Sequence, residues 1–308
     1  MRRHRKRVGL AVLGVLVACS AQALLSGMLA DLWGRRAARD PETGVLVGAE
    51  ARDLGPEDAA CAALLVHGFL GAGNNFADLP EQLAAHGWRV RVMRLPGHGT
   101  TPRDLARTTA KELEHAVSAE ARALREHHET VALIGHSMGG ALCTLAAAEG
   151  EADAVVLAAP YFGVTHHWYY LLRPEQWVAL THHFVPWTYK GSAFVQVNRK
   201  EARKQILTYK WVPAQALVTL MAIGKKVRSP EVLASVQCPV LLIHSRADQA
   251  ACPEAAARAF DAMPSARKRA VWLETSNHII FWDLERQQVA EEILDFLGGL
   301  SGSPAQPK

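Results

Sequence analysis

A serine flanked by two glycines, Gly135-His-Ser-Met-Gly139, is the sequence feature with the clearest chemical meaning. It follows a short apolar run at residues 130–134 that is typical of a buried strand, and it precedes a good helix former at residues 140–149. A strand, a G-x-S-x-G turn and a helix form the context of a nucleophile elbow, which exposes its serine at the end of the strand. The pattern therefore predicts nucleophilic catalysis by Ser137.

A serine hydroxyl is a weak nucleophile, so it needs a histidine base that is itself oriented by an acid. In enzymes with this elbow, the acid and then the histidine follow the serine along the chain. Asp248 comes just after an apolar run at residues 238–244, and His278 follows a second run at residues 269–274. Because parallel strands end at the same edge of a sheet, we expect both side chains beside Ser137.

Two backbone amides are expected to bind the oxyanion that forms during acyl transfer. Met138 directly follows the nucleophile at a helix N-terminus, where free N–H groups and the helix dipole favour negative charge. The second donor should come from the loop after an earlier strand. The apolar run at residues 62–66 ends at His67, which places the amide of Phe69 in that loop.

Other polar residues fit this chemistry less well. Asp283 is a rival acid, but it lies beyond His278 at the start of an expected helix, where it is better placed to cap the helix. The histidine pairs at 166–167 and 182–183 invite a metal interpretation. Adjacent histidines point to different faces of a helix, and no carboxylate or cysteine lies at chelating spacing. We therefore expect no metal and no organic cofactor.

Five short motifs resemble the α/β-hydrolase family, and they span most of the chain. They are His-Gly-Phe at 67–69, Leu-Pro-Gly-His-Gly-Thr at 95–100, Gly-His-Ser-Met-Gly-Gly at 135–140, Ser-Arg-Ala-Asp at 245–248 and Ser-Asn-His at 276–278. Within the family, residues 42–299 are most similar to bacterial carboxylesterases and monoacylglycerol lipases. The resemblance implies an α/β-hydrolase fold, with a mostly parallel sheet flanked by helices and a helical cap inserted between the sixth and seventh strands. It is specific for serine hydrolysis and weakly specific for substrate.

The chain begins with about forty residues that the resemblance does not cover. Residues 1–7 are basic, and residues 8–30 carry no charge over a length that can span a bilayer as a helix. An uncleaved signal anchor is the favoured interpretation, with the basic end in the cytoplasm. Ala21-Gln-Ala23 would also suit a cleaved secretory peptide. A third interpretation is a lipoprotein signal, in which Cys19 would be acylated.

The net charge of the body argues against nucleic acid as a partner. The formal charge is +4, but residues 1–7 supply five of the 34 basic side chains, which leaves 29 against 30 acidic ones. The five cysteines include no metal-spaced pair. We expect Cys252 to be exposed and no bridge between Cys238 and Cys252, since a strand separates them.

Expected strands and helices alternate along the chain, which favours a mostly parallel sheet covered on both faces. The expected strands are 61–66, 88–94, 130–135, 154–159, 239–244 and 270–274, with a shorter one near 45–50. The expected organisation is an export or anchor segment at 1–39, a hydrolase core at 40–160 and 236–300, a helical cap at 161–235 and a polar tail at 301–308.

The expected cap at residues 161–235 is rich in aromatic side chains. They are Trp168, Tyr169, Tyr170, Trp177, Trp187, Tyr189 and Trp211. An insertion at this point in α/β-hydrolases covers the nucleophile, and aromatic content suits either an apolar acyl pocket or contact with a lipid surface.

Together these features predict a membrane-associated serine esterase whose catalytic domain is periplasmic or extracellular. The expected substrates are short- or medium-chain acyl esters, with monoacylglycerol favoured. Acyl transfer or thioester hydrolysis would use the same residues, and a non-catalytic lipid-binding protein is a further alternative. The sequence leaves the oligomeric state open.

Overall fold

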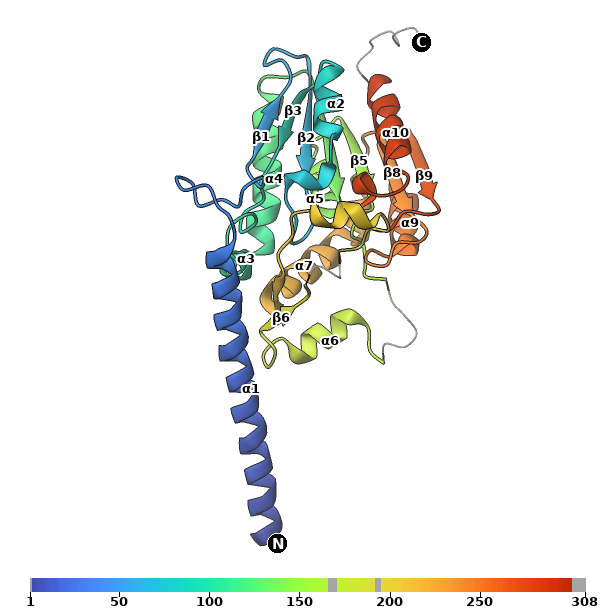
Figure 1. The fold of residues 1–308 in the computed structure, drawn as a ribbon. Coiled ribbons are helices and arrows are strands. Elements are labelled where there is room, and N and C mark those ends of the chain that lie inside the picture. The colour runs from blue at the N-terminus through green and yellow to red at the C-terminus, as the bar shows by residue number, and fades with distance from the viewer. Residues whose placement is uncertain (1, 166–170, 192–194, 301–308) are drawn as a thin grey trace.

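Seven strands form the main sheet, in the spatial order β1-β3-β2-β4-β5-β8-β9 (Figure 1). The computed structural model describes residues 2–165, 171–191 and 195–300. All neighbouring strands are parallel except β1, which is antiparallel to β3. The strands are β1 (Arg52–Leu54), β2 (Cys61–Val66), β3 (Arg89–Val92), β4 (Thr130–His136), β5 (Ala154–Ala158), β8 (Val240–Ser245) and β9 (Lys268–Leu273).

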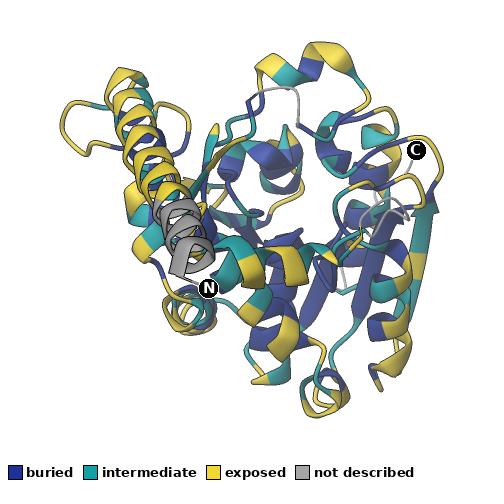
Figure 2. Ribbon diagram, turned by 90° about the horizontal axis from the view of Figure 1, so that it is seen from below, coloured by how far each residue is buried: buried dark blue, intermediate teal, exposed yellow. Residues whose placement is uncertain are grey.

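The central strands are apolar on both faces because both faces are covered. Ala62, Leu64 and Val66 of β2 belong to one hydrophobic cluster, whereas Ala63 and Leu65 belong to a second cluster on the opposite face. This alternation follows from the two-residue period of a strand. Figure 2 shows the buried strands in the middle of the molecule, between helices whose outer sides are exposed.

Helices pack on each face of the sheet, as the alternating sequence pattern predicts. One face carries α4 (Ala110–Arg125), α5 (Met138–Ala148), α7 (Ala214–Val227), α8 (Pro230–Ala234) and α9 (Pro253–Ala262). The other carries α2 (Leu79–Ala85) and α10 (Arg286–Gly298). The predicted mostly parallel sheet flanked by helices, which is the α/β-hydrolase fold, is confirmed.

The short strand expected near residues 45–50 is not present. Leu46 forms only an isolated bridge with Arg39, and the edge strand is β1, which begins at Arg52. Leu46 is held instead by a loop contact, because its amide donates to the carbonyl of Gly99.

The segment between β5 and β8 lies beyond the C-terminal ends of the strands (Figure 1). Its described elements before α7 are α6 (Pro174–Thr181), β6 (Trp187–Tyr189), η2 (Lys200–Lys204) and β7 (Trp211–Pro213), of which β6 and β7 form an antiparallel pair. We keep the name cap for residues 161–235. The insertion follows the fifth strand of the main sheet in chain order rather than the sixth, because only β1 precedes β2.

Helix α1 (Arg2–Arg36) projects away from the body past the cap, with α3 (Pro102–Arg107) beside its C-terminal end (Figure 1). Arg103 of α3 donates to Asp31 at 2.7 Å, and the ring of Trp33 meets Tyr209 edge-on at 5.8 Å. The last turns of α1 are thus packed against both the core and the cap. In the described part of the chain, no helix has both the length and the apolar character that crossing a membrane requires.

Candidate active site

Ser137 occupies a sharp turn between β4 and α5. Its backbone is left-handed, with φ 55° and ψ −118°, a conformation that costs a non-glycine residue about 1–3 kcal/mol. The flanking glycines make the turn possible, because a Cβ on Gly135 would strike the backbone of Gly139, and a Cβ on Gly139 would strike the carbonyl of Val66. The G-x-S-x-G pattern is therefore required by close backbone approach.

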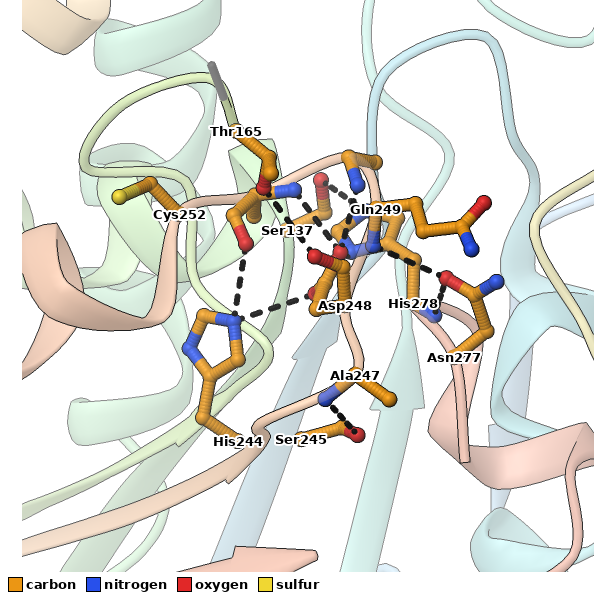
Figure 3. A network of polar contacts seen from close by, with 12 residues as sticks. Ser137, Thr165, His244, Ser245, Ala247, Asp248, Gln249, Cys252, Asn277 and His278 are labelled. Atoms are coloured by element: carbon orange, nitrogen blue, oxygen red, sulfur yellow. Dashed lines mark hydrogen bonds and ion pairs between the residues drawn. The ribbon is translucent and has the colours of Figure 1, made fainter. Parts of the chain in front are cut away.

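The structure brings Ser137, His278 and Asp248 into one hydrogen-bonded chain (Figure 3). His278 Nε2 lies 2.8 Å from Ser137 Oγ, and His278 Nδ1 lies 2.8 Å from Asp248 Oδ2. The three residues follow β4, β8 and β9, whose C-terminal ends meet at one edge of the sheet. Such an arrangement lets the imidazole accept the serine proton while the carboxylate fixes its orientation.

The Asp248 carboxylate is buried and accepts four hydrogen bonds. Oδ1 accepts from the amides of Ala250 and Ala251 at 2.7 and 2.9 Å, and Oδ2 accepts from His278 and also from His244 Nε2 at 3.1 Å. Burial raises the pKa of Asp248, but the two imidazoles outweigh this effect and hold the pKa well below its usual range. The group is therefore a carboxylate throughout the neutral pH range.

The two backbone amides expected to bind the oxyanion belong to Phe69 and Met138. Gly68 lies against the serine, since a Cβ there would be 2.9 Å from Ser137 Cβ, and Phe69 follows it in the wall of the same cavity. The Phe69 amide donates no hydrogen bond to another described residue. As the first residue of α5, Met138 has no preceding helical carbonyl to which its amide can donate. Both donors are thus available to a ligand oxygen.

Asp283 does not contact His278 Nδ1, and it does not cap α10 as expected. The residue preceding α10 is Glu285, whereas the buried Asp283 accepts the amides of Asn198, Arg199 and Asn277 at 2.7–2.9 Å. Its role is to join the cap to the loop that carries His278. This role is not indicated by the sequence, because the partners are backbone groups and two of them, Asn198 and Arg199, are distant along the chain.

Buried neutral histidines shape the loops around Ser137. His136 Nε2 lies 3.1 Å from the carbonyl of His278, and burial lowers the pKa of His136 to about 3. His67 accepts from the amide of Leu95 at 3.2 Å and packs edge-on against His98, with ring centroids 5.1 Å apart. Burial also lowers the pKa of His67 to about 3. The loops formed by residues 67–69 and 95–100 are therefore held together by the contacts of His67.

His244 was not anticipated from the sequence, although a histidine in an otherwise aliphatic strand is an informative exception. It is the penultimate residue of β8, is fully buried, and shares Asp248 Oδ2 with His278. Its Nε2 also lies 3.2 Å from the carbonyl of Ala251, so Nε2 carries the proton. Its Nδ1 has no partner among the described residues, and its ring stacks on Trp272 at 6.1 Å.

A cavity of about 400 Å³ opens beside the Ser137 hydroxyl. Much of its lining is aliphatic and comes from the cap, including Val178, Val195 and Ile206 and, from α7, Leu217, Leu220 and Met221. Of the aromatic side chains that the sequence singled out in the cap, those that the structure describes do not line it. Trp187 lies near Arg103, Tyr189 packs on Trp211 at 5.2 Å, and Trp177 is exposed. The expectation of an aromatic acyl pocket is wrong for these residues, because they pack within the cap or face solvent.

Other candidates from the sequence lie apart from this site. Residues 166–170, which include one histidine pair and three aromatics, lie outside the described residues. His182 and His183 stack on each other at 3.8 Å, and no metal-binding group of three side chains occurs in the described ranges. Cys252 is half-buried rather than exposed, and its thiol lies 3.1 Å from Glu254.

A strand-turn-helix serine, a histidine and a buried aspartate on this sheet define a serine hydrolase with the α/β-hydrolase fold. The sequence profile of the serine aminopeptidase S33 family matches residues 57–285, and the chain belongs to this family.

Comparison with individual proteins agrees with this assignment. The thermostable monoacylglycerol lipase of Bacillus sp. (strain H-257) is 28% identical over 258 residues, which cover 84% of this chain and 98% of that protein. A solved structure reported with LipS and LipT, two metagenome-derived lipolytic enzymes, has a TM-score of 0.72 at 27% identity and covers 83% of this chain and 99% of its own. The Paleococcus ferrophilus monoacylglycerol lipase shares the fold, with a TM-score of 0.68 at 21% identity over 81% of this chain and 98% of that one. The chain is a serine hydrolase of the monoacylglycerol lipase and esterase branch.

The hydrogen-bonded chain predicts the effect of removing each member. Ser137→Ala and His278→Ala should each lower kcat by about three or more orders of magnitude, because the residues act as one unit. Asp248→Asn should lower kcat by a similar amount while the protein stays folded. Ester turnover and circular dichroism would measure both effects. Asp283→Asn is the matched control for the acid, and an inactive Asp283→Asn beside an active Asp248→Asn would reverse the assignment.

The shared carboxylate oxygen predicts a positioning role for His244. His244→Leu removes one donor to Asp248 Oδ2, which leaves more negative charge facing His278 and removes one restraint on the acid. We expect about a tenfold lower kcat and an acid limb of the kcat/KM–pH profile that moves to higher pH. His244→Gln, which can still donate, should restore part of the rate. A His244→Leu enzyme with the parent rate and pH profile would contradict this role.

Proposed function

We propose that the protein hydrolyses short- to medium-chain carboxylic esters, with monoacylglycerol as the favoured class, through a Ser-His-Asp acyl-enzyme mechanism. The observation that carries this proposal is the chain of two 2.8 Å contacts from Ser137 through His278 to Asp248, at the base of an aliphatic cavity. Acyl transfer requires a nucleophile, a base and an acid that orients the base, and the aliphatic lining suits an apolar chain.

In this mechanism Ser137 Oγ attacks the ester carbonyl as its proton passes to His278 Nε2. The imidazolium is stabilised by the Asp248 carboxylate, whose depressed pKa keeps it charged. The amides of Phe69 and Met138 hold the oxyanion of the tetrahedral intermediate. His278 then protonates the leaving alcohol, and a water molecule activated by the same imidazole hydrolyses the acyl-enzyme.

The aliphatic lining supports an acyl chain as the group that fills the cavity. Leu217, Leu220 and Met221 come from α7, the helix of the cap that packs on the core, and Val195 and Ile206 come from the part of the cap that precedes α7. The similarity to a monoacylglycerol lipase favours a glyceryl ester among the possible alcohols. Acyl transfer, thioester hydrolysis and amide hydrolysis would use the same chain of three residues.

Turnover of a matched ester series would test the substrate class. Glyceryl, thiol and aryl esters with acyl chains of increasing length should show a maximum at short or medium chains, with glyceryl esters preferred. A serine-reactive fluorophosphonate should label the parent protein and leave Ser137→Ala unlabelled. Labelling without ester turnover, or with faster cleavage of aminoacyl anilides, would overturn the ester proposal, and failure to label would favour a non-catalytic lipid-binding protein.

We further propose that residues 8–30 attach the protein to a membrane, with the body on the periplasmic or outer side. The basic residues before this uncharged run favour that orientation. Within the described part of α1, Val17, Leu24, Leu25 and Met28 are all at least 60% exposed. Apolar side chains gathered on one helix without a covering surface mark an interaction site.

Two truncations would test this attachment. Deletion of residues 1–25 should move the protein from the membrane fraction to the soluble fraction, with unchanged activity. The protein without residues 1–39 should also be soluble and active. Because this deletion removes the contacts of Asp31 and Trp33, it should lower Tm by about 2–4 °C for each kcal/mol of unfolding free energy that is lost. Cys19→Ala would release the protein from the membrane only if a lipid on Cys19 is the anchor. Full-length protein found wholly in the cytosolic fraction of its host would contradict the attachment.

A further inference from the structure

A lysine without an acidic partner lies in the wall of the cavity beside Ser137. Lys190 directly follows β6, is partly buried, and is fixed by a 2.9 Å hydrogen bond from its amide to the carbonyl of Lys210. Its ammonium forms no ion pair with any described residue. The residues outside the described ranges contain no aspartate or glutamate side chain that could supply one.

The other titratable groups that line this cavity do not neutralise Lys190. Burial raises the pKa of Tyr161 to about 12 and lowers that of His136 to about 3, so both are neutral near pH 7. The His278 ring is hydrogen-bonded to Asp248 and Ser137. Glu175 lies in the first turn of α6 and also lines the cavity, but it forms no ion pair with Lys190.

A partly buried ammonium without an acidic partner is costly, because it loses part of its hydration without gaining a compensating charge. Burial accordingly lowers the pKa of Lys190 to about 8. The group therefore stays mainly charged at pH 7. An anion that entered the cavity would supply the missing partner through a charge-assisted hydrogen bond, which is stronger than a neutral one.

Building on the proposed ester hydrolysis, we propose that Lys190 is a specificity-determining residue that selects esters carrying a negative charge away from the scissile bond. The charge is a carboxylate or a phosphate, in either the acyl or the alcohol part of the ester. The cavity then combines an aliphatic wall for the chain with one cationic contact for its charged end. Neutral esters of the same shape remain substrates, because Ser137, His278 and both amides act only on the reacting carbonyl.

Matched substrate pairs would test this selection. One pair is mono-4-nitrophenyl adipate and its methyl ester, and the other is a monoacylglycerol phosphate and the monoacylglycerol with the same chain. Lys190→Met should lower kcat/KM for the charged member of at least one pair by about 10- to 100-fold and leave both neutral members within about twofold. Lys210→Met is the matched control, because Lys210 lies across from Lys190 on the neighbouring chain segment, is exposed and does not line the cavity.

The pH dependence gives a second readout. In the parent enzyme the charged-to-neutral ratio of kcat/KM should be highest below pH 8 and should fall as the pH rises through about 8, when the Lys190 ammonium loses its proton. In Lys190→Met the ratio should be flat over this range. If Lys190→Met changes the charged-to-neutral ratio for the adipate pair alone, the recognised charge lies in the acyl part of the ester. If the ratio changes for the phosphate pair alone, the charge lies in the alcohol part.

Equal losses on charged and neutral esters in Lys190→Met, or a ratio that does not change, would overturn the selection and leave Lys190 a structural residue. Thermal melting would verify that the variant is folded. Failure of the proposed ester hydrolysis itself is distinct, because no ester of either pair would then be turned over and Ser137 would not be labelled.

Discussion

The left-handed backbone at Ser137 is the constraint on which the rest of the site depends. Its cost is met by hydrogen bonds on both sides, since the Ser137 amide donates to Ala158 at 3.1 Å and its carbonyl accepts from Tyr161 at 2.9 Å. These contacts join the turn to the next strand. Because Gly68 must also approach Ser137 within contact distance, the strand that ends at residue 66 and the one that ends at residue 136 must stay in register. The register of the sheet thus fixes where the nucleophile and both amides lie.

Buried or half-buried carboxylates then hold the loops that carry no regular structure. Asp248 binds amides of its own loop, Asp283 joins the cap to the His278 loop, and Glu285 accepts the amides of residues 274–276 at 2.7–3.1 Å. Burial raises the pKa of Glu285, but the hydroxyl of Ser276 and these amides outweigh it and hold the pKa at about 2. The acid and base are therefore held rigidly by the core, whereas the cavity wall depends on the cap.

The sequence indicated the residues whose position follows from a single strand. Ser137, Asp248 and His278 each come just after an apolar run, and parallel strands bring such positions together. His244 and Lys190 were missed because their importance depends on contacts between distant segments. The same reason explains why the sequence predicts a helix cap at Asp283 and an acyl pocket lined by aromatics, whereas the structure shows neither for the described residues. A strand or helix is encoded locally, but the partner of a buried polar group is not.

The contacts at the end of α1 connect the N-terminal segment to the site. Tyr209, which meets Trp33, also donates to the carbonyl of Gly97 and accepts from the amide of Thr100, so α1, the cap and the 95–100 loop share one side chain. The exposed Asp31–Arg103 pair contributes at most about 1 kcal/mol, whereas an aromatic pair adds about 0.5–1.5 kcal/mol beyond its buried area. Packing at Tyr209, more than the ion pair, therefore sets the angle between α1 and the cap. Any surface that holds α1 consequently also fixes the orientation of the cap wall that contains Lys190.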